Sequence, residues 1–238
     1  MTATIDAGLV HSWMSHAADA LHDACPLLTE LDAARGDADH GYNMDRGFRA
    51  ISDALDAAPS ATAEQALLTS AAVLRKTMGG TTGPLWATAL RRIGKALGPG
   101  DPATPGQLAA ALQAAGDGVA DIGEAREGDN TMLDAIYPAA RALHAGVAAG
   151  DGLLVALHAA ATAATSGAQA TAERAATKGR ASYLGDRAIG KPDPGATSAA
   201  IVIVALYDAA VDDADHPPAP STPPPTLPTG SHQQDTTT

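Results

Sequence analysis

The chain has 238 residues, 45% of them apolar, which is enough for one full hydrophobic core with an appendage. Its formal net charge of −12 argues against nucleic acid or anionic membrane surfaces as partners, because an acidic surface repels phosphate groups. The single cysteine, Cys25, excludes an internal disulfide, and without a long apolar run or a basic leader segment the sequence predicts a soluble, cytoplasmic protein.

Helical patterns follow one another along most of the chain. Alanine dominates the apolar residues and aromatics make up only 3%, a composition that favours helices over strands. The first predicted helix contains Pro26, where it can break. The last contains the all-apolar stretch 199–206, whose length and flanks favour a buried helix over a strand. Hydrophobic periodicity predicts eight helices, over residues 6–31, 42–57, 62–78, 83–97, 105–122, 131–149, 152–176 and 195–211.

The composition changes after residue 211. Residues 212–238 are rich in proline and threonine and contain almost no apolar residues. Such a segment cannot bury enough surface to offset the entropy of ordering it. The sequence therefore predicts a helical domain over residues 1–211 and a disordered tail over residues 212–238.

The loops that follow the odd-numbered helices carry most of the polar and glycine-rich motifs. They span residues 36–41, 79–84, 123–131 and 178–195, whereas the loops after the even-numbered helices are bland. In an antiparallel up-and-down bundle, every odd-to-even connection lies at the same end. The four loops are therefore expected to converge on one rim and to form a composite site.

Three aspartates, Asp32, Asp37 and Asp39, lie within a stretch of eight residues, beside Gly36 and Gly41. Carboxylates this close repel unless a cation is present, and oxygen ligands suit a hard ion such as magnesium or calcium. The spacing does not match an EF-hand, and zinc would require more nitrogen or sulfur ligands than the neighbouring His40 supplies. A solvated acidic turn that caps a helix is an equal alternative.

Two other loops have features suited to an anion. Residues 79–84 form a glycine-rich turn that opens a helix, although without the lysine of a P-loop; a plain tight turn is the alternative. The last loop carries Lys178, Arg180, Arg187 and Lys191, in a chain with only 15 basic residues. Facing the aspartates, these groups would fit a phosphate held between them, or they belong to a solvated surface loop.

Taken together, the four loops resemble the L subunit of dihydroxyacetone kinase and the matching nucleotide domain of single-chain dihydroxyacetone kinases. The matching stretches read ELDAARGDADHGYNMDRGF, MGGTTGPLWATALRR, GEAREGDNTMLDAIYPA and KGRASYLGDRAIGKPDPGATSAA. The resemblance covers about residues 5–210 in the same order. It implies an all-α fold, a closed barrel of eight antiparallel helices with the nucleotide at one rim.

The resemblance also implies the site residues. Two Mg²⁺ ions would be held by Asp32, Asp37 and Asp39 against the phosphates of ADP or ATP. Arg180 would contact the nucleotide and neutralise charge during phosphoryl transfer. Thr81 and Thr82 stand where family members often have Ala-Ser, so a hydroxyl is retained at position 82. The nucleotide-binding residues would be His40, Gly41, Tyr42, Asn43, Thr81, Thr82, Gly123, Met132, Arg180, Asp193, Pro194 and Gly195.

The implied reaction is phosphoryl transfer to a small ketose such as dihydroxyacetone, bound on a separate K subunit. A phosphocarrier protein of the phosphotransferase system could recharge bound ADP, or free ATP could be the donor. Two alternatives remain: the related nucleotide domain of fatty-acid kinases, which typically has DGDTGTNM where this chain has DADHGYNM, and a non-catalytic helical scaffold.

Overall fold

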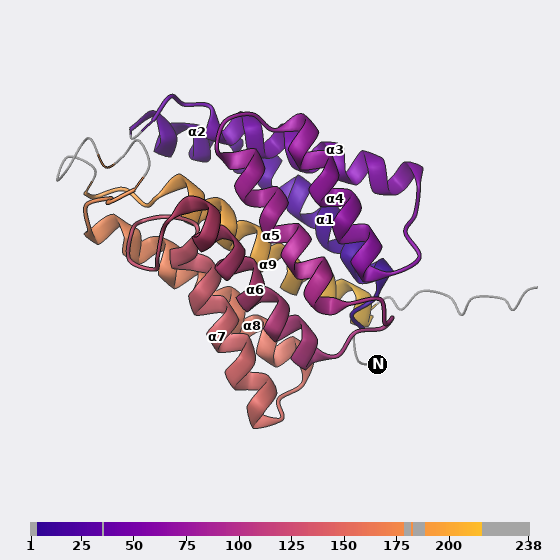
Figure 1. Cartoon of the computed structure of the whole chain (residues 1–238). Helices are drawn as coiled ribbons and strands as arrows, with labels where there is room; N and C mark the ends of the chain where they lie inside the picture. The colour runs from indigo at the N-terminus through magenta and orange to yellow at the C-terminus, as the bar shows by residue number, and fades with distance from the viewer. Residues whose placement is uncertain (1–3, 35, 179–181, 183–188, 216–238) are drawn as a thin grey trace, which may run out of the picture.

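The computed structural model describes residues 4–34, 36–178, 182 and 189–215, and within them the chain is helical throughout, with no strand (Figure 1). The helices are α1 (Ala7–Asp23), α2 (Cys25–Ala33), α3 (His40–Ala57), α4 (Ala63–Thr77), α5 (Thr82–Leu97), α6 (Pro105–Gly123), α7 (Leu133–Ala149), α8 (Leu153–Ala170) and α9 (Pro194–Asp215), with a 3-10 turn, η1, at Thr171–Glu173.

The predicted first helix is two helices, α1 and α2. The chain turns at Ala24, whose N–H still bonds to the carbonyl of Ala20. Pro26 lies in the first turn of α2, where its missing N–H costs nothing, whereas inside a continuous helix it would remove a backbone hydrogen bond. The eight predicted helices are therefore nine in the described part of the chain.

The helices form a closed ring. Leaving α2 aside, each helix packs against the next one along the chain, and α9 closes the ring by packing against α1 (Figure 1). The short helix α2 lies outside the ring, against the start of α3 and against α9. This arrangement confirms the predicted all-α, closed up-and-down bundle.

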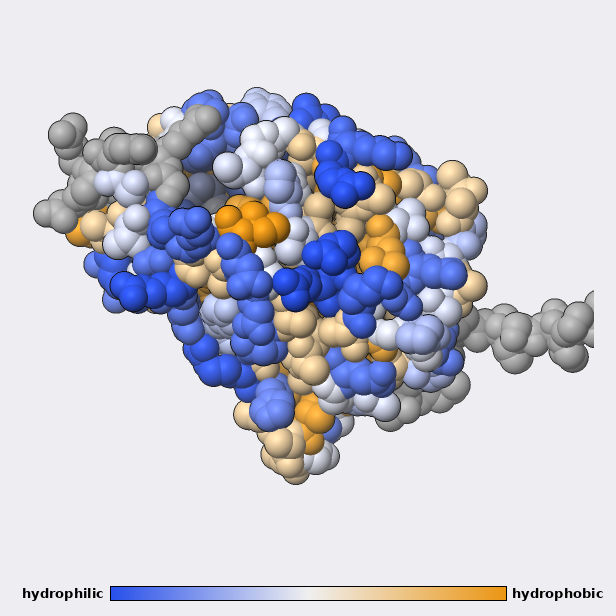
Figure 2. All heavy atoms as spheres, in the orientation of Figure 1, coloured by the Kyte–Doolittle hydropathy of each residue, from blue (hydrophilic) through white to orange (hydrophobic). Residues whose placement is uncertain are grey.

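The core lies inside this ring and consists mainly of alanine and leucine, with few large side chains. Phe48 is fully buried and meets Trp86 edge to face, with ring centroids 5.4 Å apart. Small side chains let helices approach closely, so the bundle is dense without many aromatics. Its exterior is largely hydrophilic on the face in Figure 2, with isolated apolar spots.

Helix α9 runs to Asp215, four residues past its predicted end at 211, and so takes in the first residues of the predicted tail. Its last turns are fixed by Asp212, which pairs with His16 of α1 at 2.9 Å. Among the described residues, α9 alone has the length and apolar composition to cross a membrane, but 61% of its most apolar window is buried in the bundle, as in the core helix of a soluble protein. The rest of the predicted tail, 216–238, lies outside the described residues.

Helix α8 is shorter than predicted. It ends at Ala170 instead of continuing to residue 176, and η1 and an extended segment follow it. Just after the helix ends, the side-chain amide of Asn130, from the neighbouring loop, donates to the carbonyl of Thr171 at 2.8 Å. The segment after α8 is thereby fixed against the loop between α6 and α7.

Candidate functional site

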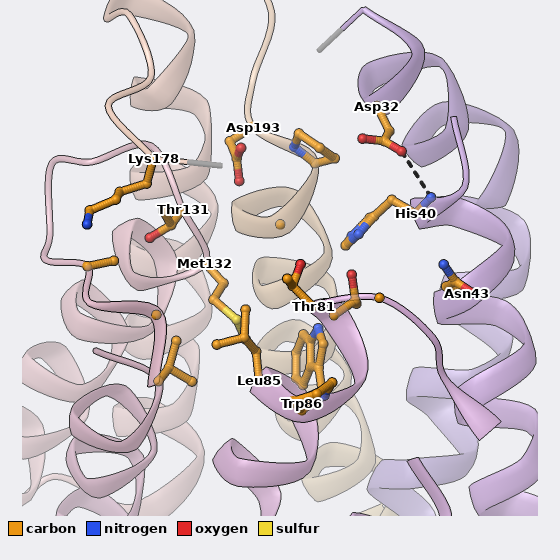
Figure 3. A pocket seen from close by; sticks show the side chains of 18 of the residues that line it. Asp32, His40, Asn43, Thr81, Leu85, Trp86, Thr131, Met132, Lys178 and Asp193 are labelled. Carbon is orange, nitrogen blue, oxygen red and sulfur yellow. Dashed lines mark hydrogen bonds between the residues drawn. The ribbon is translucent and has the colours of Figure 1, made fainter. Parts of the chain in front are cut away.

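The four loops predicted to converge do meet, around one cavity of about 550 Å³ at one rim of the bundle (Figure 3). Each loop contributes residues to its wall. They lie between Asp32 and Asn43 in the first loop, between Gly79 and Trp86 in the second, between Gly123 and Met132 in the third, and at Lys178 and Asp193–Gly195 in the fourth, although not every residue of these stretches lines the cavity. Counting helices in the sequence was thus sufficient to locate the site.

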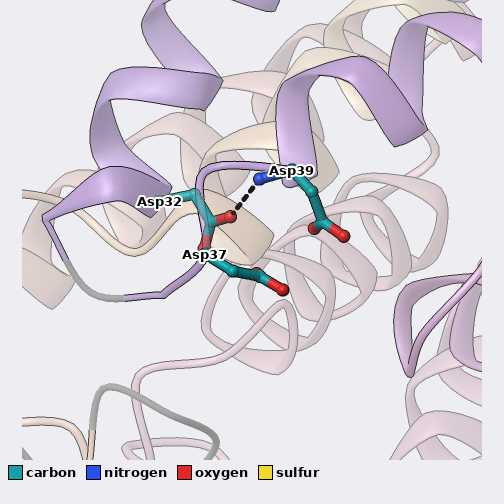
Figure 4. Close-up of side chains that lie close together, drawn as sticks. All are labelled: Asp32, Asp37 and Asp39. Carbon is teal, nitrogen blue, oxygen red and sulfur yellow. Dashed lines mark hydrogen bonds between the residues drawn. The ribbon is translucent and has the colours of Figure 1, made fainter.

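The aspartate trio lies at one edge of this cavity (Figure 4). One carboxylate oxygen from each of Asp32, Asp37 and Asp39 lies within 4.8 Å of the other two. Asp32, at the end of α2, also accepts the backbone N–H groups of Asp39 at 2.9 Å and His40 at 3.1 Å. These two bonds tie α2 to the start of α3 and hold the loop that carries the other two carboxylates.

The loop between α2 and α3 is folded tightly. Ala38, between the second and third aspartates, has a φ of 60°, the left-handed region that an alanine adopts at a cost. Gly36 packs so closely on Asp32 that a Cβ would collide with its carboxylate. Strain of this kind persists where surrounding contacts fix it, and here its consequence is three clustered carboxylates.

His40 begins α3 and lies between the aspartates and α9. It is 8% exposed, and its Nε2 lies 2.9 Å from the Ser198 hydroxyl. Burial lowers the pKa of His40, and this effect outweighs the charges of Asp32 and Asp39 and the bond to the Pro194 backbone, which raise it. The imidazole is therefore neutral at pH 7 and acts as a hydrogen-bonding group.

The glycine-rich turn leads into α5. Gly80 has a φ of 63°, which favours glycine, and a Cβ on Gly83 would lie 2.5 Å from the Met78 carbonyl, so position 83 requires glycine. Neither Thr81 before α5 nor Asp39 before α3 makes a side-chain cap. The first N–H of α3, that of His40, already donates to Asp32, whereas no side chain caps α5. An uncapped helix N-terminus carries partial positive charge and backbone donors, so α5 presents an anion-binding end at this rim.

The third loop is closed by its own carboxylates. Asp134 of α7 accepts the backbone N–H groups of Gly128 and Thr131, at 2.8 and 2.9 Å. Burial raises the pKa of Asp129, but hydrogen bonds from Thr177 and the Arg126 backbone, with nearby positive charges, lower it overall. These hydrogen bonds hold the loop in a compact conformation, which places Thr131 and Met132 against the cavity.

An apolar wall completes the cavity, and the sequence analysis did not single it out. Leu85 and Trp86 come from the first turn of α5, and Val119 and Ile122 from the end of α6. Trp86 is only 4% exposed. Leu85 and Trp86 directly follow the glycine-rich turn in the sequence, which was the available signal; the α6 residues had none.

Most of the predicted nucleotide residues line the cavity. Gly41 and Tyr42 do not: Gly41 packs against α2, and Tyr42 is 64% exposed beside the rim. Arg180 lies outside the described residues. Those that line the cavity are His40, Asn43, Thr81, Thr82, Gly123, Met132, Asp193, Pro194 and Gly195.

Comparison with known proteins places this arrangement among relatives. The family model described as DAK2 domain matches residues 34–208. The chain is 37% identical over 199 residues to an Escherichia coli protein named PEP-dependent dihydroxyacetone kinase, ADP-binding subunit DhaL, which covers 84% of this chain and 95% of the relative. It is also 39% identical over 193 residues to a D-erythrulose kinase of Mycolicibacterium smegmatis, covering 80% of this chain but 33% of that one.

A solved structure shares the fold. The crystal structure of the dihydroxyacetone kinase of C. freundii in complex with AMP-PNP and Mg²⁺ superposes with a TM-score of 0.66 and 28% sequence identity. The match covers 84% of this chain and 34% of the kinase chain. The present chain is thus similar to one part of that larger protein.

Proposed function

The chain belongs to the DAK2 domain family, and on that premise we propose that it is the ADP- or ATP-binding subunit of a dihydroxyacetone-type kinase. The observation that carries the proposal is the meeting of three clustered carboxylates, the uncapped N-terminus of α5 and an apolar wall around one cavity. The carboxylates suit Mg²⁺, a helix N-terminus suits phosphate, and the apolar wall suits the base.

The cavity suits a nucleotide in size and in polarity. Its volume of about 550 Å³ falls in the range of small-molecule sites. The wall of Leu85, Trp86 and Met132 offers apolar faces to a purine base, and the N-terminus of α5 offers donors to phosphates. The long axis of the nucleotide would run from the apolar wall to the aspartates.

The aspartate trio fits magnesium. Its ligands are all carboxylate oxygens, the donors that a hard divalent cation prefers, and the neutral His40 beside it adds no competing charge. We assign two ions to Asp32, Asp37 and Asp39; bound Mg²⁺ would neutralise the phosphate charge during transfer. We assign the same neutralising role to Arg180, a residue outside the described part of the chain.

The acceptor sugar would be supplied by a partner. Four of the five large apolar side chains that are exposed in the described part of the chain lie on segments that also contribute residues to the cavity: Leu27 on α2, Tyr42 on α3, Ile122 on α6 and Ile189 before α9. Apolar groups in this position suit a protein surface that covers the cavity and excludes water. We assign that surface to a K-type subunit that holds a small ketose, in the cytoplasm, with a phosphotransferase-system phosphocarrier as a second possible partner.

Calorimetry with ADP tests the nucleotide site. We expect binding in Mg²⁺ that is lost in EDTA, and loss of at least about ten-fold in affinity for Asp37→Asn or Asp39→Asn, since each variant removes a charged metal ligand. The matched control is Asp56→Asn, which removes a surface aspartate at the far end of α3. Unchanged affinity in either trio variant would show that the metal assignment is wrong.

A reconstitution assay tests the division of labour. The purified chain should bind Mg-ADP yet leave dihydroxyacetone unphosphorylated until a K-type subunit is added, because transfer requires donor and acceptor to be aligned. Sustained phosphorylation by the isolated chain, shown by mass spectrometry to be free of partner protein, would contradict the two-component proposal.

A further inference from the structure

Thr171 is a fully buried polar residue just after α8, and it lies outside the set of described residues that line the cavity. Its hydroxyl makes two bonds: it donates to the carbonyl of Ala168 and accepts the backbone N–H of Asp193 at 2.8 Å. The first bond is local. The second reaches over 22 residues to the turn that opens α9.

That turn forms part of the cavity wall. Asp193 caps α9 by accepting the N–H of Ala196 at 2.8 Å, and Pro194 and Gly195 line the cavity beside it. The turn also contacts His40, through the Pro194 backbone and through Ser198, whose hydroxyl donates to the Gly195 carbonyl at 3.1 Å. Through these contacts the turn packs against His40, which also lines the cavity.

Thr171 is itself held from the opposite side. Asn130 is 2% exposed, and its side-chain amide donates to the carbonyls of Thr171 at 2.8 Å and Arg174 at 2.7 Å. Asn130 adopts a φ of 58°, in the left-handed region that asparagine tolerates better than most residues. One buried threonine therefore links the loop before α7 with the turn before α9, and both loops border the cavity.

We propose that Thr171 is a positioning residue for the nucleotide: its hydroxyl fixes the Asp193–Gly195 turn at the distance from the metal loop that a bound phosphate requires. This inference rests on the proposed function. Without the hydroxyl, the Asp193 N–H loses its bond to Thr171, and the turn shifts. The metal ligands, on α2 and the loop before α3, are expected to stay in place because the bonds from Asp39 and His40 to Asp32, which hold that loop, do not involve Thr171.

The test compares Thr171→Val, which keeps the shape and removes the hydroxyl, with Thr171→Ser, which restores it. Thr165→Val is the matched control, because the Thr165 hydroxyl, on α8, donates to the carbonyl of Ala161 one turn earlier in the same helix and reaches no cavity-lining turn among the described residues. We expect Thr171→Val to weaken Mg-ADP binding about ten-fold or more, as for an orphaned buried donor, while Thr171→Ser and Thr165→Val stay within about three-fold of wild type.

Two further readouts separate positioning from general stability. Mn²⁺ alone, titrated at a temperature where all variants are folded, should bind Thr171→Val and wild type equally, and amide exchange at Asp193 should accelerate only in Thr171→Val. If Thr171→Val does not fold, Thr171→Cys, whose thiol is a weaker acceptor, should show an intermediate loss of affinity. Wild-type affinity in the folded variant, or equal losses for Val and Ser, would overturn the proposal. Wild-type protein that binds Mn²⁺ but not Mg-ADP would overturn the proposed function with it.

Discussion

Gly41 was expected to contact nucleotide, but its position in the structure predicts a different role. It is the second residue of α3, where the helix crosses α2. A Cβ at this position would collide with the Cys25 carbonyl and the Thr29 hydroxyl, and it would lie 2.9 Å from the Thr29 nitrogen. Two of these three atoms are backbone, so Gly41→Ala cannot be accommodated by rotating a side chain.

The size of the effect follows from these distances. Ordinary van der Waals contacts begin at 3.4 Å, so the contact with the Thr29 nitrogen alone requires α2 and the new Cβ to separate by at least about 0.5 Å. A shift of this size along the bonds from Asp39 and His40 to Asp32, now 2.9 and 3.1 Å, would take both beyond the ~3.2 Å limit of good geometry. Overpacking costs ~1–3 kcal/mol and the helix propensity of alanine returns up to ~1, so we expect a net loss of ~1–2 kcal/mol.

The assay combines urea unfolding with titration of Mn²⁺ and Mg-ADP. Gly106→Ala is the matched control, because Gly106 is likewise the second residue of a helix and its Cβ would meet only the Thr104 hydroxyl, at 3.9 Å. Gly41→Ala should lose stability and bind Mn²⁺ at least about ten-fold more weakly (~1.4 kcal/mol), although no metal ligand is changed. If it matches the control in stability and in Mn²⁺ affinity, the argument that Gly41 positions Asp32 is refuted.

Three further predictions concern separate parts of the chain. Burial lowers the pKa of His16, but bonds to the Ser12 backbone and Asp212 raise it overall, so the stabilisation from these bonds is complete below the unfolded pKa of 6.5 and is lost as pH rises through the folded value. Asp212→Asn should therefore lower the melting temperature in differential scanning fluorimetry more at pH 5.5 than at pH 8.5, with a difference in stability on the order of 0.5 kcal/mol. An equal effect at both pH values would exclude the pair. Truncation after Asp215 should leave the melting temperature within about two degrees, since the packed residues lie upstream, and a large drop would mean that residues 216–238 dock on the bundle. Mg-ADP should change tryptophan fluorescence in Trp13→Phe but not in Trp86→Phe, because only Trp86 lines the cavity; the opposite pattern would place the base elsewhere.

The bundle was predictable because its signals are periodic and local. Alanine and leucine recur at helical spacing, and the alternation of bland and polar loops gives the end of the bundle at which each loop lies. The break at Ala24 was only suspected, although Pro26 marked it. The end of α8 was missed, because it depends on Asn130, which is 41 residues from Thr171 in the sequence.

The site was predictable where it consists of short motifs. Asp32, Asp37 and Asp39 are close in sequence and therefore close in space. What could not be read from the sequence depends on packing between helices: the wall that Val119 joins, and the close contact of Gly41 with α2. Residues that act through a neighbour carry no motif of their own.

The central claim is that the rim holds a magnesium nucleotide, and a crystal structure with ADP and Mn²⁺ tests it most directly. Manganese stands in for magnesium and is located by its anomalous scattering. The account predicts anomalous peaks within bonding distance of Asp32, Asp37 and Asp39, and the adenine against Trp86 and Leu85. Manganese bound away from the three aspartates, or ADP bound outside this cavity, would contradict it.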